Sequence, residues 1–188
     1  TMHKPHVFYL MGPSGSGKDA LIQWAKQHFA TDENLVFAHR YITRPIDLNE
    51  NHIALTETEF LTRQRSGLFA LTWQSHQLHY GIGIEIDTWL SQGHHVLING
   101  SRAHLEQAQQ RYGNLVPILI DVDHDILAQR LQARGRESIT QIEQRLARNQ
   151  QLKPLESDIF VLHNNSSLSD AGHGLVDFLH QYMYREPQ

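Results

Sequence analysis

A glycine-rich loop near the start of the chain limits the choice of fold more than any other feature. Residues 12–18 read Gly-Pro-Ser-Gly-Ser-Gly-Lys, which matches the first seven positions of the phosphate-binding pattern G-x-x-x-x-G-K-[ST]. An apolar run, Val7–Met11, precedes the loop, and helical periodicity follows over Lys18–Phe29. A strand, a glycine-rich loop and a helix in this order predict a P-loop, in which backbone N–H groups surround a phosphate.

The residues of this loop supply both shape and charge. Glycines permit the backbone angles that turn N–H groups inward, and the N-terminus of the following helix adds partial positive charge. Lys18 adds a full positive charge, which we expect to act in catalysis on the β- and γ-phosphates of ATP. We predict nucleotide contacts from eight consecutive residues: Gly12, Pro13, Ser14, Gly15, Ser16, Gly17, Lys18 and Asp19.

The residue after the lysine departs from the pattern. Asp19 stands where a P-loop has the Ser or Thr that holds Mg²⁺. A carboxylate is a good ligand for this hard cation, directly or through water. We therefore predict that Asp19 helps to bind Mg²⁺ beside the ATP phosphates, as a ligand or through a water molecule.

A second carboxylate for the metal is not obvious. The apolar run Val96–Ile98 ends at Asn99, which carries no charge. Asp121 ends another apolar run, and Asp123 follows it, but a strand end and a helix N-cap explain these two acids more simply. The metal prediction therefore depends on Asp19.

The rest of the chain alternates short apolar runs with helical periodicity, which is typical of an α/β protein. Five runs are predicted as strands: Val7–Met11, Leu35–Ala38, Val96–Ile98, Leu115–Asp121 and Ile159–Leu162. Seven stretches are predicted as helices: Lys18–Phe29, Thr56–Ser66, Ile84–Ser91, His104–Arg111, Ile126–Ala133, Thr140–Leu152 and Leu168–Tyr184. Thr56 with Glu59 reads as a capping box at the start of the second helix.

This pattern predicts the P-loop NTPase class, with a parallel sheet flanked by helices. A chain of 188 residues has room for one core, so we predict a single domain over residues 1–188. Two segments are polar and less regular, residues 40–80 and residues 134–148. We expect both to be excursions from the sheet, the first binding the phosphoryl acceptor and the second forming a lid.

Composition excludes several classes of protein. The formal net charge is −4 and the chain has no cysteine. The negative net charge gives no general attraction to nucleic acid. Without cysteine, the chain can form neither disulfides nor thiolate metal sites. No stretch approaches the roughly 18 apolar residues of a membrane helix. We expect a cytoplasmic protein with small-molecule substrates and no nucleic-acid or membrane partner, and the sequence leaves a homodimer open.

Arginines are concentrated around the second polar segment. Arg130 and Arg134 are four residues apart, and Arg145 and Arg148 are three apart, so each pair shares a helix face. Such a run is commonly a solvated surface. In an acidic protein, however, planar guanidinium groups suit the oxygens of a phosphoryl group. We therefore predict that Arg134 and Arg145 act on the phosphoryl group during transfer.

Beyond the loop, the chain resembles the guanylate-kinase branch of the nucleoside monophosphate kinases. Thr43-Arg44-Pro45 resembles that family's acceptor-phosphate motif, and Tyr80-Gly81 resembles its second phosphate contact. Three pairs resemble its lid: Arg130-Leu131, Arg134-Gly135 and Arg145-Leu146. The resemblance implies a kinase that phosphorylates a phosphate group.

In detail, the chain more closely resembles the ribose 1,5-bisphosphate phosphokinases of bacterial phosphonate breakdown, whose pattern includes the Asp after the P-loop lysine. The resemblance is carried by His39–Arg44, Glu50–Leu55, Tyr80-Gly81, Glu85–Asp87 and Asn99–Leu105. It implies transfer of the ATP γ-phosphate to the 1-phosphate of ribose 1,5-bisphosphate, which gives 5-phosphoribosyl 1-diphosphate (PRPP) and ADP. It also implies substrate binding by Arg40, Arg44, Tyr80 and Arg102.

The positions that read guanine in guanylate kinases favour this closer resemblance. Acidic side chains accept hydrogen bonds from the base there, whereas this chain has Leu71 and Ser101. A buried guanine edge left without acceptors costs about 1–3 kcal/mol per donor. Guanylate kinase, or another nucleoside monophosphate kinase, stays the alternative. A non-catalytic binding module is a third hypothesis, which the intact Lys18 disfavours.

Overall fold

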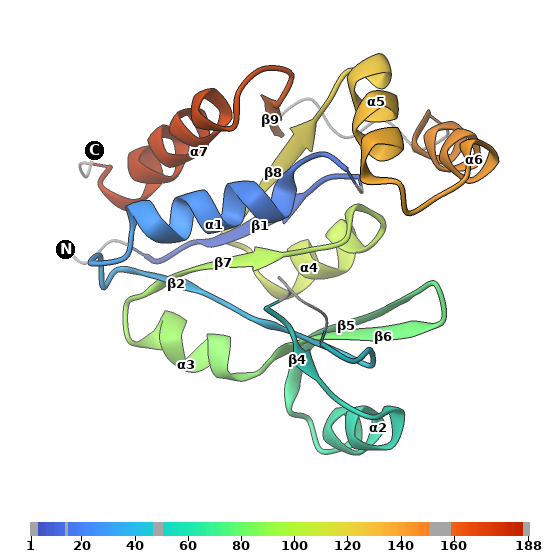
Figure 1. Cartoon of the computed structure of the whole chain (residues 1–188). Helices are drawn as coiled ribbons and strands as arrows, with labels where there is room; N and C mark the ends of the chain where they lie inside the picture. Colours follow the sequence, from blue (N-terminus) through green and yellow to red (C-terminus); the bar gives the residue numbers. More distant parts are fainter. Residues whose placement is uncertain (1–3, 14, 47–50, 151–158, 186–188) are drawn as a thin grey trace. The chain divides into compact units, whose positions relative to one another are not determined.

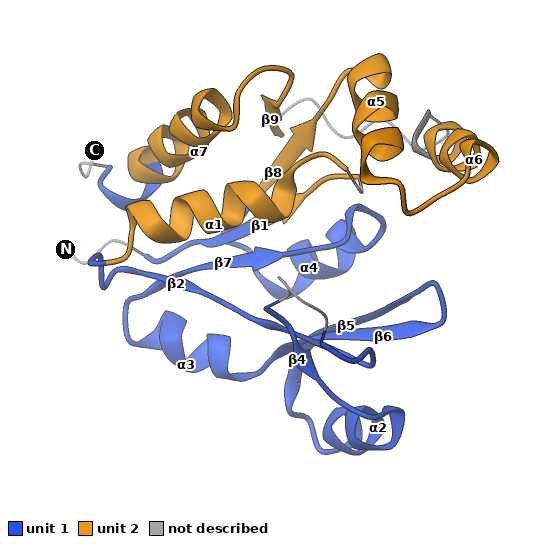
Figure 2. Ribbon diagram, viewed as in Figure 1, with its two compact units in different colours: residues 1–9, 31–116, 182–188 blue, residues 10–30, 117–181 orange. Residues whose placement is uncertain are grey.

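The computed structural model describes residues 4–13, 15–46, 51–150 and 159–185. The chain divides into two compact units (Figure 2). Unit 1 comprises residues 1–9, 31–116 and 182–188, and unit 2 comprises residues 10–30 and 117–181. The single-domain organisation stays a prediction.

A five-stranded sheet has the strand order β2-β7-β1-β8-β9 (Figure 1). Its strands are β1 (Val7–Met11), β2 (Leu35–Phe37), β7 (His95–Asn99), β8 (Leu115–Asp121) and β9 (Phe160–His163). β2 is parallel to β7, and β8 is parallel to β9. Every residue of β1 and β7 is buried, as expected for parallel strands covered on both faces. The five predicted strands are confirmed to within one residue at each end.

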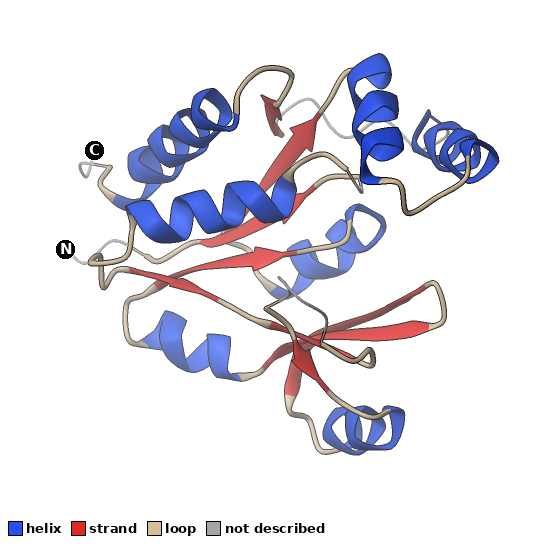
Figure 3. Cartoon of the chain, in the orientation of Figure 1, coloured by secondary structure: helices blue, strands red, loops and turns tan. Residues whose placement is uncertain are grey.

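Seven α-helices occur in the described residues, as predicted (Figure 3). Their ends lie within two residues of the prediction, except that the predicted end at Leu152 lies outside the described residues. The helices are α1 (Lys18–His28), α2 (Glu57–Arg65), α3 (Glu85–Ser91), α4 (Leu105–Arg111), α5 (His124–Arg134), α6 (Ile139–Gln150) and α7 (Leu168–Met183). A 3₁₀ turn, η1 (Arg102–His104), precedes α4. Over the described part of the chain, none of these helices has the length and apolar character needed to cross a membrane.

Local capping explains where two of the helices begin. At α2 the predicted capping box is confirmed: the Thr56 hydroxyl accepts from the Glu59 N–H, and the Glu59 carboxylate accepts from the Thr56 N–H. At α6, Ser138 and Gln141 exchange the same pair of bonds. Asp123 is the N-cap residue of α5, as predicted, but its side chain makes no capping hydrogen bond.

The segment 40–80 is more regular than the sequence indicated, so the expectation of less regular structure there was wrong. Its role as an acceptor-binding excursion stays a prediction. The segment forms a second sheet with the order β4-β3-β6-β5 and carries α2. The strands are β3 (Arg40–Ile42), β4 (Ile53–Ala54), β5 (Phe69–Ser75) and β6 (Leu78–Gly83).

The hairpin between β5 and β6 turns through His76 and Gln77, both with positive φ. Positive φ at both central residues belongs to a type I′ turn, for which Asn-Gly is the usual sequence signal. This turn lacks that signal, and both residues of β4 are exposed. The second sheet could therefore not be recognised from the sequence.

Candidate active site

The P-loop lies in unit 2, between the end of β1 and the start of α1. Gly15 and Gly17 have φ of 85° and 86°, a region that residues with a Cβ rarely adopt. The Ser16 N–H donates to the Pro13 carbonyl oxygen at 3.1 Å, which closes a tight turn. The backbone thus has the left-handed turns that a phosphate-binding loop needs. Ser14 lies outside the described residues.

Lys18 and Asp19 place opposite charges at the first turn of α1. The Lys18 Nζ donates to the Gly12 carbonyl oxygen at 3.4 Å, so the ammonium lies back over the loop. Asp19 is exposed, and its carboxylate complements the positive N-terminal end of the helix. The structure thus places a cation over the loop and an exposed carboxylate beside it, and their roles in binding ATP and Mg²⁺ stay predictions.

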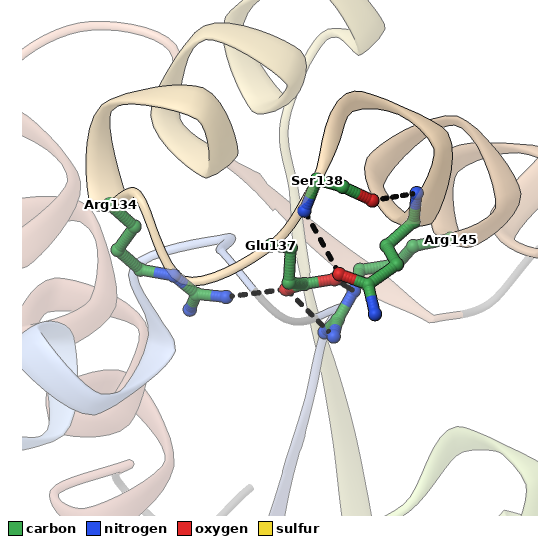
Figure 4. A network of polar contacts seen from close by, with 5 residues as sticks. Arg134, Glu137, Ser138 and Arg145 are labelled. Atoms are coloured by element: carbon green, nitrogen blue, oxygen red, sulfur yellow. Dashed lines mark hydrogen bonds and ion pairs between the residues drawn. The ribbon is translucent and has the colours of Figure 1, made fainter.

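The two predicted lid arginines lie together on one carboxylate, that of Glu137 (Figure 4). The Arg134 Nη2 lies 3.2 Å from the Glu137 Oε1. The Arg145 Nη2 lies 2.9 Å from the same oxygen, and its Nε donates to the other carboxylate oxygen at 3.1 Å. Glu137 was not predicted from the sequence, because only the structure shows that both arginines contact this acid.

The helices that carry these arginines pack together. A buried apolar cluster joins α5 to α6 through Val122, Leu127, Leu131, Ile142 and Leu146. Arg130 behaves differently from its neighbour Arg134. Its Nη2 donates to the Asn164 carbonyl oxygen at 2.8 Å, so it anchors backbone instead of forming part of the group around Glu137.

In unit 1, the structure brings together Arg40 and Tyr80. The Tyr80 ring on β6 stacks on the Trp73 ring of β5, with centroids 5.5 Å apart and planes inclined by 6°. The Arg40 guanidinium carbon lies 5.5 Å from the centroid of Tyr80, within range of a cation–π interaction. Trp73, which the sequence analysis missed, therefore helps to hold a predicted substrate-binding residue.

Hydrogen bonds from Thr43, His79 and His52 hold the backbone around Arg44. The Thr43 N–H donates to the His79 carbonyl oxygen, and the His79 N–H donates to the Thr43 hydroxyl at 2.9 Å. The buried His52 donates from Nε2 to the Arg44 carbonyl oxygen at 2.8 Å, since a carbonyl can only accept. His52 lies within the segment Glu50–Leu55 that carries the family resemblance, but its contact could not be foreseen.

Packing explains the glycine that follows Tyr80. A Cβ at Gly81 would lie 2.7 Å from the Phe69 ring and 3.1 Å from the Phe60 ring. Only glycine lets this strand pass so close to β5 and α2.

Two further predicted positions of unit 1, Ser101 and Arg102, follow β7. Arg102 begins η1 and is partly buried. The Ser101 hydroxyl lies 3.0 Å from the His104 Nδ1, and the Ser101 carbonyl accepts from the Tyr9 hydroxyl at 2.6 Å. Burial raises the pKa of Tyr9, so its hydroxyl stays a donor. Leu71, the other position that stands where guanylate kinases read guanine, lies on β5 and is 4% exposed.

Comparison with known proteins identifies close relatives over nearly the whole chain. The chain is 50% identical to ribose 1,5-bisphosphate phosphokinase PhnN of Thiobacillus denitrificans, over 95% of this chain and 94% of that protein. It is 51% identical to the protein of the same name from Psychromonas ingrahamii, over 94% of this chain and 90% of the relative. It is 54% identical to the protein of this name from Pectobacterium parmentieri, over 86% of this chain and 87% of the relative.

Solved structures agree on the fold. Guanylate kinase from Anaplasma phagocytophilum superposes with a TM-score of 0.70 over 98% of this chain and 89% of that chain, at 14% identity. A search of protein-family models finds no match. The fold is therefore that of a P-loop kinase, and identity at this level over this length places the chain in the ribose 1,5-bisphosphate phosphokinase family.

Proposed function

We propose that this kinase transfers the γ-phosphate of ATP to the 1-phosphate of ribose 1,5-bisphosphate, giving PRPP and ADP. The family supports this reaction. The observation that carries it is the state of the two positions where guanylate kinases read guanine: Leu71 is buried and apolar, and the Ser101 hydroxyl is engaged by His104. Measuring ADP release with ribose 1,5-bisphosphate as acceptor tests the proposal.

On the donor side, we assign ATP to the P-loop and the lid arginines of unit 2. The loop amides and Lys18 would bind the outer phosphates, and the helix dipole of α1 would add to their attraction. Arg134 and Arg145 already converge on one carboxylate, so an incoming phosphoryl group would meet a preassembled pair of guanidinium groups in place of Glu137.

The donor set fits a magnesium ion. Asp19 presents an exposed, hard oxygen ligand one residue beyond the phosphate-binding lysine, and Mg²⁺ characteristically binds one or two carboxylates together with substrate phosphates. When bound, Mg²⁺ neutralises charge on the transferring phosphoryl group. Asp19 would hold this cation next to Lys18.

On the acceptor side, the chemistry needs little from the protein beyond position. A phosphomonoester at pH 7 is largely dianionic, because its second pKa is about 6. An oxygen of the 1-phosphate attacks the γ-phosphorus, and the bond from that phosphorus to the ADP oxygen breaks. No general base is required. Arg40, Arg44, Tyr80 and Arg102 would hold the acceptor and offset its negative charge.

Replacing Asp19 by alanine is expected to raise the Mg²⁺ concentration for half-maximal activity several-fold, because one metal-binding oxygen is lost. Asp19→Ser restores the usual P-loop residue and should keep the wild-type magnesium dependence. Asp170→Ala, which removes an acid from the first turn of α7, is the control. An unchanged magnesium titration for Asp19→Ala would show that this residue only complements the helix dipole.

Replacing Arg44 by alanine is expected to raise the KM for the acceptor about tenfold or more, the usual size of a charge-assisted hydrogen bond, and to leave the KM for ATP unchanged. Initial rates with each substrate varied in turn make the comparison. Arg65→Ala removes an exposed arginine from the end of α2 in the same unit and should change neither constant. If Arg44→Ala instead changed only the KM for ATP, Arg44 would not belong to the acceptor site.

A further inference from the structure

Asn164, which follows β9 in unit 2, links the P-loop to two distant parts of its unit. It is 4% exposed. Its side-chain Nδ2 donates to the Ser16 carbonyl oxygen at 2.7 Å across 148 positions of sequence. Its backbone N–H donates to the Asp121 carbonyl at the end of β8, and its carbonyl accepts from Arg130 of α5, both at 2.8 Å. Asn164 is therefore itself fixed at two points while it holds the loop.

The hydrogen bond to the Ser16 carbonyl also sets the direction of the next N–H. The peptide between Ser16 and Gly17 is planar and trans, so its C=O and N–H point in opposite directions. An amide donor that holds the carbonyl on one side turns the Gly17 N–H to the other. This N–H is one of the loop donors that surround a phosphate.

The approach of Asn164 is close and specific to the backbone. A Cβ at Gly17 would lie 2.5 Å from the Asn164 Nδ2, so a side chain at position 17 would displace the amide. The Ser16 hydroxyl oxygen is buried and has no hydrogen-bond partner among the described residues. The contact thus acts on the Ser16–Gly17 peptide, and Ser16 contributes its carbonyl to it.

We propose that Asn164 is a positioning residue of the donor site. Its amide orients the Ser16–Gly17 peptide, and through the Gly17 N–H it sets the affinity of the loop for the phosphates of ATP. Arg130 supports this role by holding the Asn164 carbonyl. The inference rests on the proposed function only in taking ATP as the nucleotide that the loop binds, and it is independent of the acceptor.

Asn164→Asp is the sharpest test. The two side chains have the same shape, but a carboxylate has no N–H, so an acceptor would face the Ser16 carbonyl oxygen. Asn165→Asp is the matched control: it adds the same charge one residue away and keeps the oxygen that accepts from the Asp123 N–H at 2.7 Å. Calorimetric titration with Mg-ATP should show a Kd raised about tenfold or more for Asn164→Asp, and within about twofold of wild type for Asn165→Asp.

Thermal unfolding without nucleotide separates this role from a merely structural one, which would lower Tm but leave the Kd of the folded protein unchanged. An unchanged Kd for Asn164→Asp, or equal losses in both variants, would overturn the proposal. If Asn164→Asp does not fold, Asn164→Ala replaces it, and an ATP-induced rise in Tm equal to that of wild type would overturn the proposal. Wild-type protein that binds ATP but leaves ribose 1,5-bisphosphate unused would refute the proposed function while this test still stands.

Discussion

Lys18→Ala should lower the turnover of phosphoryl transfer by about 10²-fold or more, with little change in the folded structure. The lysine is partly buried, and its hydrogen bond to the Gly12 carbonyl is long, at 3.4 Å, so the loss of that bond should cost the fold little. Its charge is needed where negative charge moves during transfer, and the loss of one such electrostatic contact typically costs about two to three powers of ten in turnover. Coupled measurement of ADP release, with circular dichroism on the same sample, gives both quantities.

Lys26→Ala provides the control for Lys18→Ala. Lys26 lies in the last turn of the same helix and is also partly buried, where desolvation lowers its pKa. Removing it takes away the same charge far from the loop, so turnover should stay near that of wild type. Near wild-type turnover of Lys18→Ala would refute the assignment of the P-loop as the donor site.

Ribose 1,5-bisphosphate should be a good acceptor and GMP a very poor one. A guanine base needs hydrogen-bond acceptors, but Leu71 offers only an apolar side chain, and Ser101 offers a single hydroxyl, shared with His104, in place of a carboxylate. GMP can still bind weakly through its phosphate, because a site that merely lacks base contacts discriminates less than one built to reject the analogue. Turnover is therefore the quantity to compare, at matched acceptor concentrations and after subtraction of the ATPase background.

Ribose 5-phosphate completes the comparison of acceptors. It keeps the sugar and the 5-phosphate but lacks the 1-phosphate whose oxygen attacks, so it should give no ADP above background. Equal rates with GMP and ribose 1,5-bisphosphate would show that the chain is an ordinary nucleotide kinase. A rate with ribose 5-phosphate above background would show that the acceptor atom has been wrongly assigned.

The α/β architecture could be predicted closely because its signals are local. A strand that is buried on both faces is apolar along nearly its whole length, and the wholly buried run at Val7–Met11 has the observed bounds. The second sheet could not be found in this way. Its β4 is exposed, and its hairpin turns at His76 and Gln77, which adopt positive φ without the Asn-Gly signal of a type I′ turn.

The candidate site likewise contains residues that the sequence predicts and residues that only the structure shows. By itself, the sequence determined the phosphate-binding loop from Gly12 to Lys18, because adjacent residues with a strand before them and a helix after them create that geometry locally. Only the tertiary structure decided the residues that hold the site in place: Trp73 against Tyr80, Glu137 between two arginines, and Asn164 on the loop. The Asn164 contact joins residues 148 positions apart, so no periodicity or spacing in the chain could reveal it.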